Sequence, residues 1–164
     1  MPDAASTGPV DDHAAIEDLL YAYADLVDRA RLDELMELFT EDAVLDYGFA
    51  RLFTGRDLLR TLFADRLLAT YAATSHHVSN VRIAVDGDRA TATCHIHAWH
   101  QRADDGSQPE VWGRYDDDLV RTADGWRIAR RTIRAAGERG FPVPDGQPSA
   151  FEPIERHTTE SPDA

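Results

Sequence analysis

The sequence has a single cysteine, Cys94, among its 164 residues. It cannot form a disulfide within the chain, which fits a reducing compartment. It also lacks any run of 18 consecutive apolar residues, so no membrane span is expected. The start, MPDAASTGPVDD, has neither the basic residues nor the apolar run of a signal peptide. We therefore expect a cytoplasmic protein.

Basic residues are few relative to acidic ones. The chain has 17 Lys and Arg against 30 Asp and Glu, a formal net charge of −13. Nucleic-acid phosphates and anionic membrane surfaces would repel it, so neither is an expected partner. No GxGxxG, Walker or GxSxG motif is present, and no internal repeat. We expect a single domain without a cofactor that acts on a small-molecule substrate.

The first half of the sequence has the spacing of amphipathic helices. Residues 1–10 are expected to form a flexible arm, and Asp11 or Asp12 is a candidate N-cap for the helix that follows. Apolar residues recur with helical periodicity in three segments, residues 16–30, 33–39 and 56–70. Before the last of these, EDAVLDYG alternates like a strand that ends at Gly48.

The second half indicates two long β-hairpins. HHVSNVRIAVDGDRATATCHIHAWHQR is expected to turn at Asp86-Gly87, and VWGRYDDDLVRTADGWRIARRTIRAA at Asp124-Gly125. Helices followed by long antiparallel strands predict an α+β fold, with the helices packed on one face of a curved sheet. The tail, residues 137–164, contains Pro and Gly and has no clear periodicity.

Alternation along residues 91–100 separates two faces of a strand. One face suits a pocket wall with a single proton-transfer group. Its residues are Ala92, Cys94, Ile96, Ala98 and His100. The other face, with His95, His97 and Trp99, is expected to contact another copy of the chain. No third ligand accompanies His95 and His97 at a recognisable spacing, so we expect no metal site. At the strand end, His100 is either the pocket group or a solvent-exposed histidine.

Two adjacent histidines, His76 and His77, point to opposite faces once the strand has begun. His76 shares its face with Asn80, and a neutral imidazole there can act as a general base. A carboxylate bonded to the far ring nitrogen would fix the tautomer. Asp28, near the end of the first helix, is the candidate partner, and Asp25 is the competing one.

Two tyrosines and one charged pair are further candidates. Tyr23 lies on the apolar stripe of the first helix, where its hydroxyl needs a partner, either in the core or on a substrate carbonyl. Tyr47 ends a strand, and its hydroxyl reaches either the pocket or solvent. Arg114 and Asp116 would bind a polar substrate if they face the pocket. If they face away, they form a structural or oligomer contact, and a single bulge would reverse the choice.

The order and spacing of these motifs resemble the nuclear transport factor 2-like superfamily, and within it the SnoaL-like branch that contains scytalone dehydratase and bile-acid dehydratases. The matching motifs are YADLVDRARLDELMELFTEDAVLDYG, TSHHVSN, DGDRATATCHIHAWHQR and DGWRI, within residues 11–136. The resemblance implies one domain, in which a cone-shaped, curved antiparallel sheet is closed by three N-terminal helices around an apolar pocket. The tail itself leaves two alternatives: Phe141 or Phe151 lies over the pocket as a lid, or the tail is disordered.

The resemblance also implies residue roles. The expected catalytic residues are Tyr23, Asp28, Tyr47, His76 and His100. The expected substrate-binding residues are Asn80, Ile96, Arg114 and Asp116. Two positions depart from the dehydratase pattern: Val27 stands where scytalone dehydratase has a tyrosine, and Asp116 stands at the place of an amide. A homo-oligomer, a trimer or a dimer, is also implied.

These features predict a dehydratase for a small cyclic or polyketide-like substrate. A histidine removes the proton next to a carbonyl, hydroxyl donors hold the enolate, and His100 protonates the departing hydroxyl. An isomerase or cyclase would use the same proton abstraction without losing water. A non-catalytic subunit, resembling the β-subunits of ring-hydroxylating dioxygenases, is the alternative from another class, and a cone filled by bulky side chains would favour it.

Overall fold

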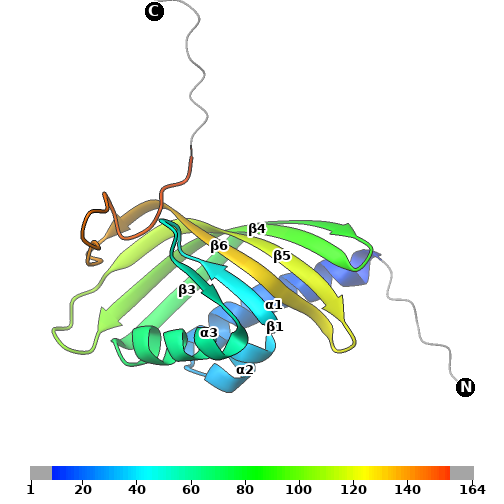
Figure 1. Ribbon diagram of the computed structural model, residues 1–164, viewed down its shortest axis with the longest axis horizontal. Coiled ribbons are helices and arrows are strands. Elements are labelled where there is room, and N and C mark those ends of the chain that lie inside the picture. Colours follow the sequence, from blue (N-terminus) through cyan, green and yellow to red (C-terminus); the bar gives the residue numbers. More distant parts are fainter. Residues whose placement is uncertain (1–8, 156–164) are drawn as a thin grey trace, which may run out of the picture.

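A curved six-stranded sheet with helices packed on one face forms the fold (Figure 1). The computed structural model describes residues 9–155. In chain order the elements are α1 (Pro9–Asp28), α2 (Leu32–Glu37), β1 (Phe39–Asp46), β2 (Leu52–Thr54), α3 (Arg56–Leu62), the π-helix η1 (Phe63–Leu68), β3 (Tyr71–Asp86), β4 (Arg89–Arg102), β5 (Glu110–Thr122) and β6 (Gly125–Arg139). The predicted α+β architecture is confirmed. None of the helices in this part of the chain has the length and apolar character needed to cross a bilayer.

The strands lie in the order β2-β1-β6-β5-β4-β3. Both predicted hairpins form, and each two-residue turn lies one residue away from the expected position, at residues 87–88 and 123–124. One pairing departs from the expected antiparallel sheet, because β1 runs parallel to β6. The strand β1 enters the sheet from α2 rather than through a hairpin, so its direction is not restricted to antiparallel.

The start of α1 differs from the prediction. The helix begins at Pro9, so the last two residues of the expected arm are helical, and proline is well suited to a first helical turn. The rest of the arm, residues 1–8, lies outside the described residues, as do residues 156–164 of the tail. Asp12 is not an N-cap. It is buried, and accepts hydrogen bonds from Arg121 (2.8 Å to each carboxylate oxygen) and from the indole of Trp126 (3.2 Å).

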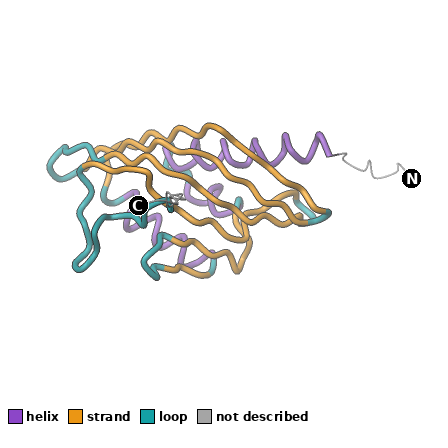
Figure 2. The backbone as a smooth tube through the Cα atoms, turned by 90° about the horizontal axis from the view of Figure 1, so that it is seen from above, coloured by secondary structure: helices purple, strands orange, loops and turns teal. Residues whose placement is uncertain are grey.

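The core lies between the concave face of the sheet and the helices, and strand alternation decides which residues reach it. The apolar face of residues 92–100 is buried, whereas His95 is exposed and His97 and Trp99 are partly exposed on the outer face. Loops of residues 140–148 gather at the end of the sheet that is remote from the start of α1 (Figure 2). The helices therefore cover the concave face, and residues 140–148 lie at one end of the sheet.

A fully buried ion pair connects the two last strands. The Nε and Nη2 atoms of Arg131 donate to the two carboxylate oxygens of Asp117 at 2.8 and 2.7 Å, and both side chains are at most 1% exposed. The guanidinium lies between the rings of Tyr23 and Tyr115, with Cζ 4.0 and 4.2 Å from their centroids. Burial lowers the pKa of Arg131, but Asp117 outweighs burial and holds that pKa above its ordinary value. Arg131 therefore stays charged and links α1, β5 and β6.

Removing the carboxylate of Asp117 should destabilise the fold strongly. The variant Asp117→Ala leaves the charge of Arg131 buried without a partner, which typically costs about 3–5 kcal/mol. Its neighbour Asp116 provides the matched control, because its side chain is 36% exposed where it pairs with Arg114. Asp116→Ala should cost less than about 1 kcal/mol. Urea unfolding followed by circular dichroism measures both, and equal losses would contradict the prediction.

The outer face of the sheet carries a stack of aromatic rings. Trp112, 40% exposed, stacks on His97 with ring centroids 5.1 Å apart and ring planes 5° apart. His77 also stacks on His97, with ring centroids 6.0 Å apart. Half-exposed aromatic side chains are enriched at protein interfaces. The stack is thus consistent with self-association through this face, which stays a prediction.

Light scattering at micromolar concentration should show a dimer or a trimer. Trp112→Arg should shift the mass toward that of a monomer, because it places a charge in the centre of the expected contact. Leu58→Arg is the control, since Leu58 is an exposed apolar residue on α3, away from the outer face of the sheet. A monomeric wild-type protein, or equal dissociation by both variants, would contradict this expectation.

Candidate active site

The end of α1 and the start of β3 bring Asp28 and His76 together. The Nδ1 atom of His76 lies 2.7 Å from Oδ1 of Asp28, and the backbone N–H of His76 donates to Oδ2 at 2.8 Å. The hydroxyl of Thr74 donates to Oδ1 at 2.8 Å. One carboxylate thus holds the strand at three points. The competing carboxylate, Asp25, pairs instead with Arg29 on the surface.

The pair leaves one nitrogen of His76 available. Burial raises the pKa of Asp28, but the hydrogen bonds from His76 and Thr74 outweigh burial, so the pKa lies below its ordinary value. An ionised carboxylate only accepts hydrogen bonds, so Nδ1 carries the proton and Nε2 is unprotonated in the neutral ring. No residue in the described chain bonds to Nε2, and the side chain lines an internal pocket while being 8% exposed. His76 is therefore placed to accept a proton from a bound molecule.

Two adjoining cavities lie between the helices and the concave face of the sheet. The inner pocket has a volume of about 60 Å³. Its polar lining consists of Tyr23, Tyr47, His76, His100 and Tyr115. The outer chamber, about 420 Å³, extends from it toward the tail. The two cavities share Tyr47, Phe63, Leu67, His100 and Phe151. A ligand in the chamber can therefore extend a reactive group to His76.

The tyrosines of the inner pocket are hydrogen-bond donors at neutral pH. Burial raises the pKa of Tyr23, Tyr47 and Tyr115 above the ordinary value of 10.0. Tyr23 and Tyr47 line the pocket as expected, whereas Tyr115 was not predicted. The sequence signal for Tyr115 is its spacing from two apolar residues, Val111 and Leu119. All three lie an even number of residues apart, so they share one face of the strand, and all three are buried. Strand alternation from these three positions points to Tyr115 if no bulge intervenes, which the sequence could not establish.

His100 lies at the junction of the two cavities and is uncharged at neutral pH. Its ring centroid is 4.6 Å from that of Tyr71 and 5.3 Å from those of His76 and Phe141. Burial, followed by the neighbouring His76, lowers the pKa of His100 to about 4. A neutral ring has no imidazolium proton to give, so this pKa does not support the expected role of His100 as the acid that protonates the leaving group. A neutral His100 can still donate a hydrogen bond, and its buried Nδ1 has no partner among the described residues.

Two expected substrate-binding residues lie outside the pocket. Arg114 and Asp116 are on the outer face, where Nε of Arg114 donates to Asp116 at 3.0 Å. The buried Tyr115 and Asp117 occupy the inner face of the same strand, and alternation turns their neighbours outward. The prediction that Arg114 and Asp116 bind substrate is therefore wrong.

Asn80 also departs from its expected place, whereas Ile96 lines the inner pocket as predicted. The pairing of β3 with β4 shifts register between Ser79 and Arg82, so β3 has one extra residue there. Asn80 takes a positive φ of 52° in this bulge, and its amide nitrogen lies 3.2 Å from Nδ1 of His95 on the outer face. A bulge changes which face a side chain reaches, which strict alternation does not anticipate.

The tail places both predicted phenylalanines at the outer chamber. Phe141 and Phe151 line it, with their ring centroids 5.2 Å apart. The segment around Phe151 is held to β6, because the backbone N–H of Ala135 donates to the carbonyl of Glu152 and Ile154 donates back to Ala135, each at 2.9 Å. Closure of the chamber by the tail stays a prediction.

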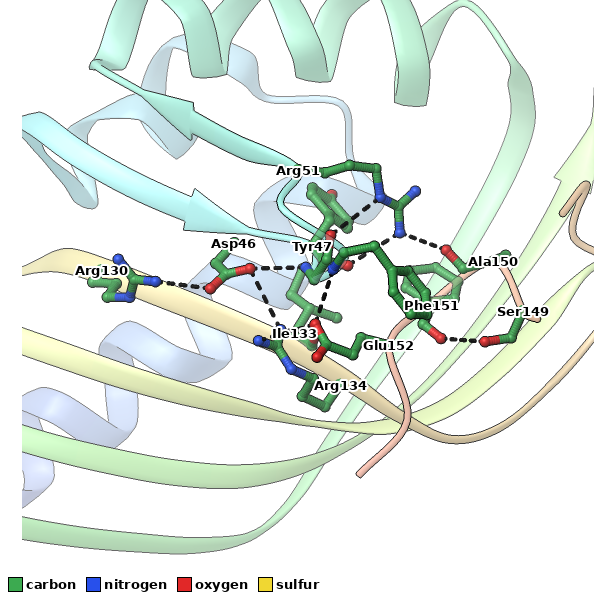
Figure 3. A network of polar contacts seen from close by, with 12 residues as sticks. Asp46, Tyr47, Arg51, Arg130, Ile133, Arg134, Ser149, Ala150, Phe151 and Glu152 are labelled. Atoms are coloured by element: carbon green, nitrogen blue, oxygen red, sulfur yellow. Dashed lines mark hydrogen bonds and ion pairs between the residues drawn. The ribbon is translucent and has the colours of Figure 1, made fainter. Parts of the chain in front are cut away.

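A polar network attaches this segment to the sheet (Figure 3). Arg51 donates from Nη2 to the carbonyls of Tyr47 at 3.1 Å and Ala150 at 2.6 Å. The carboxylate of Glu152 accepts from the backbone N–H of Phe49 at 2.9 Å and lies 3.4 Å from Arg134. These contacts fix the wall of the chamber that Phe151 forms.

Two other kinds of catalysis, by a metal ion and by a lysine Schiff base, depend on side chains of particular kinds. Within residues 9–155, no group of three or more His, Cys, Asp or Glu side chains is placed to hold a metal ion. Nε2 of His97 lies instead 3.0 Å from Glu110 on the outer face. The sequence contains no lysine, so a Schiff base on a lysine side chain is excluded.

The family of the chain follows from comparison with known proteins. Residues 9–132 match the SnoaL-like domain. This chain therefore belongs to the SnoaL-like family, within the nuclear transport factor 2-like superfamily. The uncharacterized protein Rv2910c of Mycobacterium tuberculosis is 34% identical over 131 residues, which are 77% of this chain and 86% of the relative.

Two solved structures from Novosphingobium aromaticivorans have the same fold. A candidate scytalone dehydratase superposes with a TM-score of 0.82 at 26% identity, covering 91% of this chain and 97% of its own. A candidate aromatic ring hydroxylase superposes with a TM-score of 0.76 at 29% identity, covering 82% and 96%. These likenesses confirm the predicted superfamily and fold.

His100 should make stability depend on pH below neutrality. An unfolded histidine has a pKa of about 6.5, and the folded value is about 4. Between these values the unfolded chain binds a proton that the folded chain does not, so the free energy of unfolding falls as the pH drops from about 6.5 to about 4. His100→Gln should flatten this part of the curve. Urea unfolding of both proteins from about pH 7 to about pH 4.5 measures it. Equal slopes would contradict the buried, neutral state of His100.

Proposed function

We propose that this protein is a cofactor-independent lyase that removes water from a small cyclic β-hydroxy carbonyl compound. The observation that carries the proposal is the pair of Asp28 and His76, because it leaves Nε2 unprotonated on a side chain that lines the inner pocket. The pocket surrounds this nitrogen with apolar walls and neutral hydroxyl donors. Such an environment favours proton abstraction next to a carbonyl.

The first step is transfer of the α-proton to Nε2 of His76. The carboxylate of Asp28 stabilises the imidazolium that forms, as it already accepts the proton on Nδ1. The electron pair of the broken C–H bond moves to the carbonyl oxygen. The protonated hydroxyls of Tyr23, Tyr47 and Tyr115 line the pocket that receives this enolate oxygen. Donors fixed in advance stabilise the charge without reorganisation.

The second step expels the β-hydroxyl as water. The enolate electrons form the new carbon–carbon double bond and restore the carbonyl, and the departing hydroxide takes a proton. The imidazolium of His76 supplies it, which returns the ring to its starting state. His100 stays neutral and donates or accepts a hydrogen bond at the hydroxyl, consistent with its pKa of about 4. His76 thus serves as base and then as acid.

Two further observations support an enzyme of this kind. The cone encloses an outer chamber of about 420 Å³, whereas a non-catalytic subunit would be expected to fill it with side chains. The candidate scytalone dehydratase covers nearly the whole chain at 26% identity. An isomerase or cyclase would share the first step and differ in the fate of the hydroxyl.

Turnover of a bicyclic β-hydroxy ketone tests the proposal. The compound 3-hydroxy-1-tetralone loses one water and tautomerises to 1-naphthol, which fluoresces. We expect the purified protein to produce 1-naphthol without added metal or cofactor. Deuterium exchange next to the carbonyl without loss of water would favour the isomerase or cyclase. Neither exchange nor dehydration across a panel of cyclic β-hydroxy ketones would contradict the proposed function.

Substitution of the two adjacent histidines should separate the base from its neighbour. His76→Ala should lower kcat/KM by about 10² to 10⁴-fold, the usual contribution of a general base. Asp28→Asn should cost less, because the imidazole remains but its charged form loses its partner. His77→Ala is the control, since His77 lies on the outer face, and its rate should stay close to that of wild type. An essential His77 with a dispensable His76 would refute the assignment.

A further inference from the structure

The outer chamber has a positive lining in an acidic protein. Two charged residues line it, and both are arginines, Arg51 and Arg66; no described Asp or Glu is among the lining residues. Acidic residues outnumber basic ones by 30 to 17 in the whole chain. The rest of the lining is mainly aromatic and apolar. The chamber therefore has the opposite charge to the chain that builds it.

Neither arginine is neutralised within the described chain. The hydrogen-bond partners of Arg51 are backbone carbonyls, which carry no net charge. Arg66 lies on η1 with an exposed side chain, and no hydrogen bond or ion pair joins it to another residue in the range 9–155. A guanidinium is always charged at physiological pH and presents a fork of donors to an anion. Both side chains thus retain free capacity for a negative group.

The carboxylates of this corner are occupied by other groups (Figure 3). Asp46 accepts from Arg130 at 2.7 Å and lies 3.5 Å from Arg134. Glu152 also pairs with Arg134, at 3.4 Å. Glu138 accepts hydrogen bonds from two backbone amides of the tail, at 2.7 and 3.1 Å. The positive charge at the chamber is therefore left for a ligand.

We propose that the substrate is an amphipathic organic anion, with an apolar ring system in the outer chamber and a carboxylate or phosphate group at Arg66 and Arg51. The inference rests on the proposed function for the other end of the molecule, which must reach His76. A volume of about 420 Å³ is within the range of small-molecule sites. An anion beside the exposed Arg66 keeps part of its hydration, so its desolvation costs little. Charge-assisted bonds then select acidic over neutral ring compounds.

A matched pair of fluorescent probes tests this without turnover. Anilinonaphthalene sulfonate and N-phenylnaphthylamine share an aromatic body, and only the first is an anion. We expect the sulfonate to bind more tightly, with an affinity that falls as salt is added. Arg66→Gln should weaken sulfonate binding about threefold to tenfold, and Arg66→Glu should weaken it more. Binding of N-phenylnaphthylamine should change less than about twofold. Arg82→Gln is the control, because Arg82 is exposed on β3 and does not line the chamber.

Competition identifies the anion. Naphthoate and naphthyl phosphate should both displace the sulfonate probe. The one that binds more tightly shows which anionic group the arginines prefer. The neutral methyl naphthoate should compete poorly. Equal binding of the two probes, an unchanged Arg66→Gln, or an equal loss in Arg82→Gln would overturn the inference. A protein that selects anions but dehydrates no cyclic β-hydroxy ketone, whether neutral or bearing a carboxylate, would instead contradict the proposed function alone.

Discussion

The buried pair of Asp117 and Arg131 is the constraint on which the rest of the structure depends. Two charges without access to water are tolerated only when each finds its partner in good geometry. Here that requires β5 and β6 in one register, and the rings of Tyr23 and Tyr115 on either side of the guanidinium. Because Tyr23 belongs to α1, the same pair sets the position of the helix that carries Asp28. Two tyrosines of the inner pocket and the carboxylate that holds His76 are thus positioned together.

Asp28 shows how the site uses an electrostatically unfavourable position. A carboxylate near the C-terminal end of a helix faces the negative end of the helix dipole. Three hydrogen bonds from β3 compensate for this and hold the pKa of Asp28 low. The same bonds fix the tautomer of His76. The same set of contacts therefore stabilises the helix end and orients the ring of His76, so a change in these contacts affects both.

The side chains that line the inner pocket are mostly neutral, although the charged guanidinium of Arg131 packs against two of them, Tyr23 and Tyr115. The inner pocket pairs one histidine with a carboxylate and keeps its other polar groups neutral, since burial raises the pKa of the tyrosines and lowers that of His100. The outer face carries ion pairs such as Arg114 with Asp116. The arginines of the outer chamber supply positive charge where water is still available. This change from a neutral inner pocket to a positively charged outer chamber suits the proposed ligand, which is apolar at the end near His76 and negatively charged at the other end.

The sequence by itself determined the α+β fold, the two hairpins and the inward face of residues 92–100, because periodicity within one element is a local property. Alternation showed that only one of His76 and His77 can face the pocket, and the resemblance to the dehydratases indicated His76 with Asp28 as its candidate partner. Only the tertiary structure decided that Arg114 and Asp116 face outward, since alternation gives relative facing and the buried Asp117 selects one of two choices. Tertiary structure also decided the bulge at Asn80 and the parallel pairing of β1 with β6. The pKa of His100 depends on burial and on His76, which is distant in sequence, and so no local pattern could reveal it.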